Sequence, residues 1–141
     1  MKKVISLILF VILITALSIT AFAASYTIDS GTCGINGSNL RWKLYNDGTL
    51  VIEGTGKMRP YGNSRYHNGE YVTDAPWGKY FDELESVDIE EGITVIGEYA
   101  FYGCSGLTGS LVIPDSVNVI GMSAFDSCTG FDGKLIIGEN V

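Results

Sequence analysis

Basic side chains and histidine are both scarce in this sequence. Nine Lys and Arg residues oppose 16 Asp and Glu residues, which gives a formal net charge of −7 at pH 7. This balance excludes proteins that wrap nucleic acid or bind anionic membranes through a polybasic surface. The one histidine, His67, is flanked by Tyr66 and Asn68, so neither a hydrolase triad nor a zinc site finds its usual partners. The sequence therefore predicts a protein that is not an enzyme and that holds no cofactor and no metal.

Cysteine is also sparse, with three residues and no Cys-x-x-Cys pair. An odd number leaves at least one thiol unpaired, and so small a number excludes a dense disulfide framework. Cys104 and Cys128 lie 24 residues apart in matching contexts. They either form a disulfide between stacked units or act as small buried apolar residues in a ladder, and we favour the ladder.

The first 23 residues have the pattern of a secretory signal peptide. Lys2 and Lys3 precede an apolar run, and Ala21 and Ala23 occupy the positions that a signal peptidase reads. A membrane-anchoring helix is the alternative, because the run approaches the ~20 residues that span a bilayer. Cleavage after Ala23 leaves seven basic against 16 acidic side chains, a net charge of −9, and places the protein outside the cell. The 18 glycines all follow this leader, and such a content argues against a helical bundle.

An internal repeat is the strongest signal in the chain. Residues 89–112 aligned with residues 113–136 match at ten of 24 positions without a gap. A third copy begins at residue 137, and Leu84, Val87 and Ile89 resemble the end of an earlier copy. A unit of this size cannot bury its own apolar side, so its neighbours in a stack must cover it. The period therefore predicts a solenoid.

Each copy contains a short β-branched run at residues 111–113 and 135–137. Alternate residues of such a strand face the core, and the others face outward. Ala124 and Phe125 fit one short helical turn. Stacking in register then aligns like residues in structural ladders, which are Ile89/Ile113/Ile137, Phe101/Phe125 and Cys104/Cys128.

Residues 84–141 resemble a known family. The Ile-Gly pair, the Ala-Phe pair two residues later, the following Cys and Leu, and the strand beginning Ile-Pro are similar to the BspA-like leucine-rich repeats of bacterial surface proteins. Residues 30–77 resemble the segment that often precedes these repeats. Phe131 in place of Leu107 and Ser127 in place of Gly103 depart from the pattern. The resemblance implies a secreted or surface-attached solenoid that serves adhesion or protein contact without catalysis.

The N-terminal part predicts a β-rich cap on the first repeat. Apolar and polar residues alternate over 40–45 and 50–53, and Asp47-Gly48 between them favours a tight hairpin. We expect residues 57–76 to form an irregular loop and residues 77–84 a short helix. The predicted fold is mainly β with short helical turns: a signal peptide over 1–23, a capping segment over 24–83, and leucine-rich-repeat-type coils over 84–141, with two full copies and a truncated third.

Three functions remain open from the sequence. The first is binding of an extracellular or cell-surface protein through outward residues of the repeat strands, which are Ser86, Asp88, Ser110, Val112, Lys134 and Ile136. The second is a structural spacer or scaffold in a larger wall-attached protein, in which neighbouring domains cover that stripe. The third is glycan binding through Tyr61, Tyr66, Tyr71 and Trp77. We expect no nucleic-acid partner, no membrane span after cleavage, and self-association through the C-terminal edge, where Leu135 and Ile137 lack a following coil.

Overall fold

The computed structural model describes residues 24–36 and 39–141. The predicted signal peptide over residues 1–23 lies outside the described residues. Within these described ranges strands dominate, and one 3-10 helix, η2, forms at Pro76–Tyr80. The strands are β1 Thr27–Thr32, β2 Leu40–Tyr45, β3 Thr49–Gly54, β4 Gly56–Lys57, β5 Arg65–His67, β6 Glu70–Val72, β7 Ser86–Ile89, β8 Ile93–Ile96, β9 Leu111–Ile113, β10 Val119–Ile120 and β11 Leu135–Ile137.

The N-terminal strands β1, β2 and β3 form an antiparallel sheet. The predicted hairpin between β2 and β3 is present, and its turn holds Gly48 at φ 75°. The Asp47 carboxylate accepts a hydrogen bond from the Thr49 backbone N–H at 3.0 Å, which closes the turn. Strand β3 then pairs in parallel with β7, with Val51 opposite Asp88. The cap and the first repeat strand therefore share one sheet.

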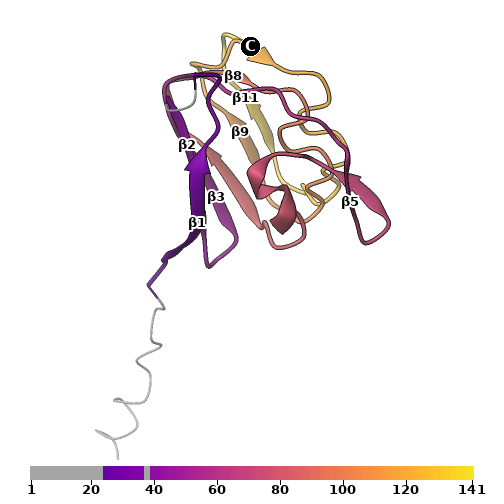
Figure 1. Ribbon diagram of the computed structural model, residues 1–141. Helices are drawn as coiled ribbons and strands as arrows, with labels where there is room; N and C mark the ends of the chain where they lie inside the picture. Colours follow the sequence, from indigo (N-terminus) through magenta and orange to yellow (C-terminus); the bar gives the residue numbers. More distant parts are fainter. Residues whose placement is uncertain (1–23, 37–38) are drawn as a thin grey trace, which may run out of the picture.

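The repeats stack as parallel coils, as Figure 1 shows. Strand β11 pairs with β9 so that Leu135, Ile136 and Ile137 lie opposite the residues 24 positions earlier. A second parallel ladder joins β10, β8 and β4. The predicted mainly β fold of stacked repeats is confirmed.

The short helical turn predicted at Ala124 and Phe125, and its equivalent after β8, are single hydrogen-bonded turns; the Ala124 N–H, for example, donates to the Gly121 carbonyl at 3.2 Å. No helix forms there; separate i to i+3 hydrogen bonds appear instead, from the Ala100 N–H to the Gly97 carbonyl at 3.2 Å and from the Cys104 N–H to the Phe101 carbonyl at 3.0 Å. The physical reason is the left-handed backbone at Tyr99 (φ 53°), which interrupts a continuous helix. Ser123 repeats this conformation 24 residues later, at φ 52°.

The segment expected to be an irregular loop contains a β-hairpin of β5 and β6, with Tyr66 opposite Tyr71. Its two-residue turn is Asn68-Gly69, with φ angles of 48° and 95°. Left-handed backbone at both turn residues is typical of tight hairpins, and an Asn-Gly pair adopts it readily. The hairpin projects from the molecule at the element labelled β5 in Figure 1.

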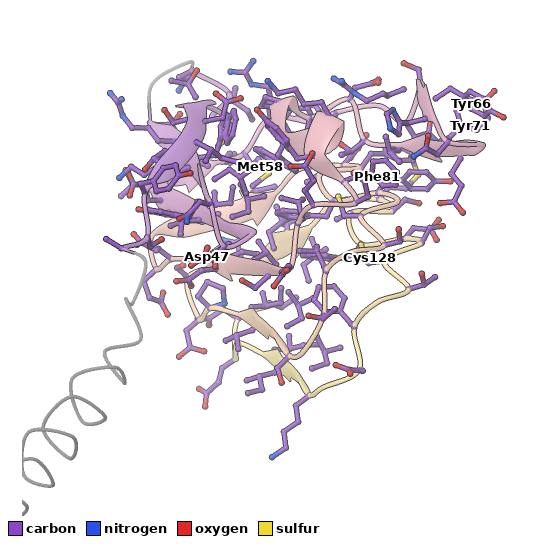
Figure 2. All side chains as sticks on the ribbon, turned by 90° about the horizontal axis from the view of Figure 1, so that it is seen from below. Asp47, Met58, Tyr66, Tyr71, Phe81 and Cys128 are labelled. Atoms are coloured by element: carbon purple, nitrogen blue, oxygen red, sulfur yellow. The ribbon has the colours of Figure 1, made fainter. Side chains whose placement is uncertain are left out.

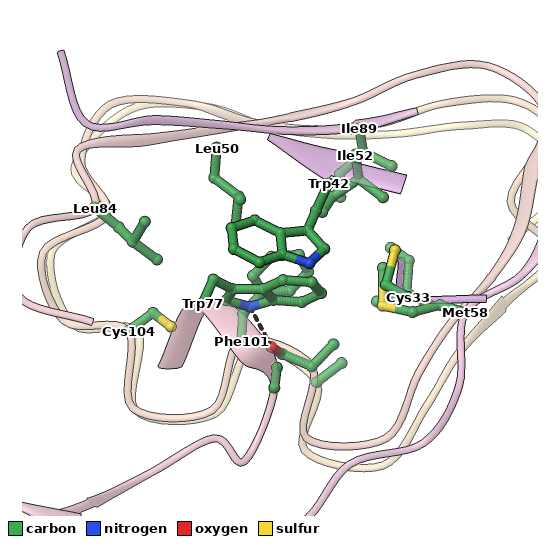
Figure 3. Packing of buried hydrophobic residues seen from close by; sticks show 14 of the residues in the cluster. Cys33, Trp42, Leu50, Ile52, Met58, Trp77, Leu84, Ile89, Phe101 and Cys104 are labelled. Carbon is green, nitrogen blue, oxygen red and sulfur yellow. Dashed lines mark hydrogen bonds between the residues drawn. The ribbon is translucent and has the colours of Figure 1, made fainter. Parts of the chain in front are cut away.

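One hydrophobic core runs through the cap and the repeats. Trp77 of η2 is fully buried at its centre, 6.0 Å from the Trp42 ring and 5.6 Å from the Phe101 ring. Its indole N–H donates a hydrogen bond to the Ala100 carbonyl at 2.9 Å, the dashed line in Figure 3. Thus η2 fastens the cap to the first repeat. In the part of the chain that the structure describes, none of the helical segments has the length and apolar character to span a bilayer.

Candidate binding surface

The strands of the cap and repeats present one outward face. Lys43 lies opposite Val51, Val51 opposite Asp88, and Val112 opposite Ile136. Strand β7 lies beside β9, which joins the two sets of pairs. The row Lys43, Val51, Asp88, Val112 and Ile136 therefore crosses β2, β3, β7, β9 and β11, and we call it the outward row.

Of the six residues predicted to face outward, Asp88, Val112 and Ile136 belong to the outward row, and Ser86, Ser110 and Lys134 each precede one of them by two residues in the chain. Val112 and Ile136 are 49% and 50% exposed, which leaves a contiguous apolar patch across two coils. Asp88 and Lys134 are also exposed.

The two serines connect neighbouring strands. The Ser110 hydroxyl oxygen accepts a hydrogen bond from the Lys134 backbone N–H at 2.9 Å. Ser86 donates its hydroxyl to that of Thr49 at 3.2 Å. These hydroxyls hold the strands in register, so the side chains left for a partner are mainly those of the outward row.

Sequence reasoning missed Lys43 and Val51 of the outward row. The alternation that placed Leu50 and Ile52 inward also placed Val51 outward, but the pairing of β3 with β7 is not readable from the chain. The Lys43 ammonium contacts Glu53 at 2.9 Å, and this hydrogen bond raises the pKa of Lys43. Lys43 is therefore cationic at neutral pH.

The ladder residues lie inside the coils, except for Ile137. The Phe101 and Phe125 rings stack with centroids 4.9 Å apart and planes inclined by 6°. The Ile89 and Ile113 side chains are buried, whereas Ile137 on the outermost strand is 52% exposed.

All three cysteines are free thiols. The Cys128 thiol donates to the Phe101 carbonyl at 3.0 Å. Burial raises the pKa of Cys33 and Cys128 to about 12, and it raises the pKa of Cys104 as well. These groups stay protonated at neutral pH and are poor nucleophiles and poor metal ligands.

The four aromatic residues expected to bind a glycan do not form one exposed surface. Trp77 is fully buried, and Tyr61 is half-buried against it with ring centroids 5.5 Å apart. Both belong to the core because the chain folds η2 inward to cover the repeats. Tyr66 and Tyr71 alone of the four are exposed, at 64% and 57%.

Acidic side chains at the turns hold successive coils together. The Glu91 carboxylate accepts hydrogen bonds from the Asp115 and Ser116 backbone N–H groups, each at 3.2 Å. Asp115 in turn accepts the Glu139 N–H at 3.0 Å. Among residues 24–36 and 39–141, no group of three or more His, Cys, Asp and Glu is arranged to hold a metal ion.

The excess of acidic over basic side chains lies in residues 79–141. Residues 24–78 carry five basic and five acidic side chains. Residues 79–141 carry 11 acidic side chains against Lys79 and Lys134, a net charge of −9. Lys79 is paired with Asp29 of the cap at 2.8 Å, and this contact lowers the pKa of Asp29. The repeat region therefore presents a strongly electronegative surface.

Comparison with known proteins identifies the repeats. The sequence profile of the "BspA type Leucine rich repeat region (6 copies)" matches residues 79–139. A crystal structure of a leucine-rich repeat protein from Eubacterium ventriosum is similar to this chain, with a TM-score of 0.60 and 27% identity over 80% of the chain. This chain spans 28% of the length of that protein. No curated protein matches the chain. Residues 79–139 thus belong to the BspA-type leucine-rich repeats.

Proposed function

We propose that this protein is a non-catalytic, secreted or cell-surface module that binds another extracellular protein through its outward row. The observation that carries the proposal is the apolar patch of Val112 and Ile136, which are about half exposed and adjacent on β9 and β11. Exposed apolar side chains that are contiguous and rimmed by polar residues mark protein contact sites. Asp88 and Lys134 supply that rim.

Repeat architecture supports the same proposal. Parallel coils present a flat, rigid face whose side chains are spaced by the strand register, and solenoids use such faces for binding. The serine and carboxylate hydrogen bonds between coils hold this face in shape before a partner arrives. A preformed face loses little conformational entropy on binding.

The test is binding of the purified protein to a panel of purified extracellular-matrix and cell-surface proteins. Replacing Val112 and Ile136 with Glu should weaken capture of a bound partner by about tenfold or more, because each charge replaces an apolar contact. The matched control is Val119→Glu with Met122→Glu, since these residues are 48% and 60% exposed but lie outside the outward row. Equal loss in both double variants contradicts a specific face.

A spacer or scaffold role is the second candidate. It is favoured by the likeness to a leucine-rich repeat protein of which this chain covers 28%. In that case the outward row is covered by other parts of an assembly, and the panel yields no partner. Protection of the outward row from solvent in the intact cell-surface protein, measured by hydroxyl-radical footprinting, supports this role, and full exposure opposes it.

A further inference from the structure

A cavity lies beneath the projecting hairpin, away from the outward row. Its volume is about 310 Å³, and it is lined by Glu70, Tyr71, Tyr102, Gly103, Ser127 and Thr129. The first two residues come from β6, and the others come from equivalent turns of the two repeat copies. Figure 2 shows Tyr66 and Tyr71 together at a corner of the molecule.

The walls of this cavity are held in place by close packing. Gly103 has φ 70°, and a Cβ atom there would lie 2.7 Å from the Tyr71 carbonyl oxygen. The hairpin therefore rests directly on the first copy, and the Thr73 N–H donates to the Tyr102 carbonyl at 2.8 Å. The second copy has Ser127 in the equivalent position, with the same left-handed backbone. This substitution places a hydroxyl at the rim of the cavity.

Two edge-to-face tyrosine pairs border the cavity. The Tyr66 and Tyr71 rings are 5.1 Å apart, and the Tyr99 and Tyr102 rings are 5.6 Å apart. One ring of each pair, Tyr71 and Tyr102, lines the cavity. Aromatic faces carry partial negative charge, and they attract cations within about 6 Å of the ring centroid.

The one charged side chain among the lining residues is acidic, although the hairpin also carries Arg65 and His67 on β5. Glu70 is the ionisable carboxyl of the lining, and none of the six lining residues is basic. The second-copy wall carries Asp126, which accepts the Ser127 hydroxyl at 3.4 Å. The surrounding repeats have a net charge of −9 over residues 79–141. This field repels phosphate and carboxylate ligands and attracts cations.

We propose that this cavity receives an Arg or Lys side chain of a partner protein, held over Tyr71 and Tyr102 and neutralised by Glu70. This goes beyond the proposed function, since the residues concerned are separate from the outward row. A neutral sugar would use the same rings, but it gains nothing from the carboxylate or from the negative field. The combination of aromatic faces, a carboxylate and hydroxyls at Ser127 and Thr129 matches a guanidinium or ammonium group, which carries only hydrogen-bond donors.

The test is titration of the ¹⁵N-labelled protein with Nα-acetylarginine amide, followed through backbone amide NMR shifts. The control probe is Nα-acetylcitrulline amide, which has nearly the same shape but no charge. We expect arginine to shift the amides of Glu70, Tyr71, Gly103 and Ser127, and the citrulline probe to bind about tenfold more weakly.

Matched variants separate the ring from the charge. Tyr71→Phe keeps the aromatic face and should retain binding, whereas Tyr71→Leu should abolish the shifts. Glu70→Gln should weaken arginine binding several-fold. Glu85→Gln removes the same charge at a different cavity, lined by Asp47, Glu83 and Glu85, and should change little.

Three outcomes overturn the proposal. Equal affinity for the arginine and citrulline probes would show that the positive charge of the ligand does not contribute to binding. Shifts confined to the cavity beside Asp47 and Glu85 would show that arginine senses only the general negative field. Shifts at Tyr71 and Tyr102 with maltose or cellobiose, and none with arginine, would assign the cavity to a sugar.

Discussion

Gly103 and its counterpart Ser127 show how one position is used differently in two copies of a repeat. Both have left-handed backbone, with φ angles of 70° and 61°. In the first copy the hairpin occupies the space that a side chain would fill, so glycine is required. In the second copy the hairpin does not cover this position, so a serine side chain fits there. Its left-handed backbone costs about 1 kcal/mol or more.

Replacing Gly103 with Ala should therefore destabilise the protein by about 3 kcal/mol, the sum of backbone strain and displacement of β6. The matched control is Gly109→Ala, because Gly109 has nearly the same φ of 69° but nothing within 4 Å of an added Cβ. It should cost only about 1–2 kcal/mol. Urea unfolding followed by circular dichroism measures both variants. Equal losses would mean that the hairpin moves aside freely.

The buried thiols make the free energy of unfolding depend on pH in the alkaline range. In the unfolded chain a thiol ionises near pH 9, but in the folded protein the pKa of Cys33 and of Cys128 is about 12. Between these values the unfolded state binds fewer protons than the folded state, so the free energy of unfolding falls as pH rises. Below pH 9 this contribution is fully present.

We expect the urea midpoint to fall between about pH 9 and about pH 12, with each buried thiol contributing at most about 1.4 kcal/mol per pH unit above its unfolded pKa. Cys104→Ala removes one such group, and the decline should then be shallower. An unchanged slope in that variant would show that other groups, such as tyrosines, cause the alkaline loss.

At the scale of elements, η2 has the largest structural role for its length. Five residues, Pro76–Tyr80, bring Trp77 into the core and place Lys79 and Tyr80 on Asp29 of β1. The Tyr80 hydroxyl donates to the Asp29 carboxylate at 2.9 Å. This short helix thus contacts both the edge strand of the cap and the first turn of the repeats.

Trp77→Phe tests this connection. The change leaves the Ala100 carbonyl without its 2.9 Å hydrogen bond and opens a small cavity, and together these should cost about 2–4 kcal/mol. Trp42→Phe is the control, because it removes the same volume from the core and leaves the Ala100 bond intact. Thermal unfolding should rank Trp77→Phe clearly below Trp42→Phe. If Trp42→Phe unfolded at a lower temperature than Trp77→Phe, η2 would not be the element that holds the cap and the repeats together.

At the scale of the whole molecule, the stack of coils leaves β11 on its outside. Leu135 and Ile137 occupy the positions of the buried Leu111 and Ile113, yet they are 62% and 52% exposed. The outer strand offers unpaired backbone groups and apolar side chains together, which is the usual cause of edge association.

We therefore expect this polypeptide to self-associate through β11, as the sequence indicated. Its apparent mass in size-exclusion chromatography with light scattering should rise with concentration. Leu135→Lys with Ile137→Lys should give a monomer at every concentration, because charges on an edge strand oppose pairing. Ile35→Lys with Tyr66→Lys instead should leave the association intact, because these residues are 54% and 64% exposed but lie outside the repeat coils. A wild-type monomer that is independent of concentration would contradict the prediction.

Much of the fold was predictable because its information is local and repeated. The 24-residue period aligned Leu111 with Leu135 and Val95 with Val119, and the structure has both pairs. Alternation over 40–45 and 50–53, with Asp47-Gly48 between them, predicted the cap hairpin. The β5–β6 hairpin was missed because residues 57–76 are mostly polar and show no regular alternation of apolar residues, although Asn68-Gly69 is a hairpin turn signal.

The candidate surfaces, like the fold, could be predicted only in part from the sequence. Asp88, Val112 and Ile136 could be assigned from alternation within each copy, whereas Lys43 and Val51 depended on β3 lying beside β7. The cavity under the hairpin joins Tyr71 to residues 31 and more positions later, and no pattern in the chain links them.

By itself, the sequence determined the repeat, its pitch, its inward and outward faces and the excess of negative charge, because each follows from residues close together or regularly spaced. Only the tertiary structure decided which aromatic residues are exposed. Trp77 and Tyr66 lie only 11 residues apart in the chain, yet packing against Phe101 buries Trp77, while the β5–β6 hairpin leaves Tyr66 exposed. Burial depends on contacts between distant segments, and these form only when the chain is folded.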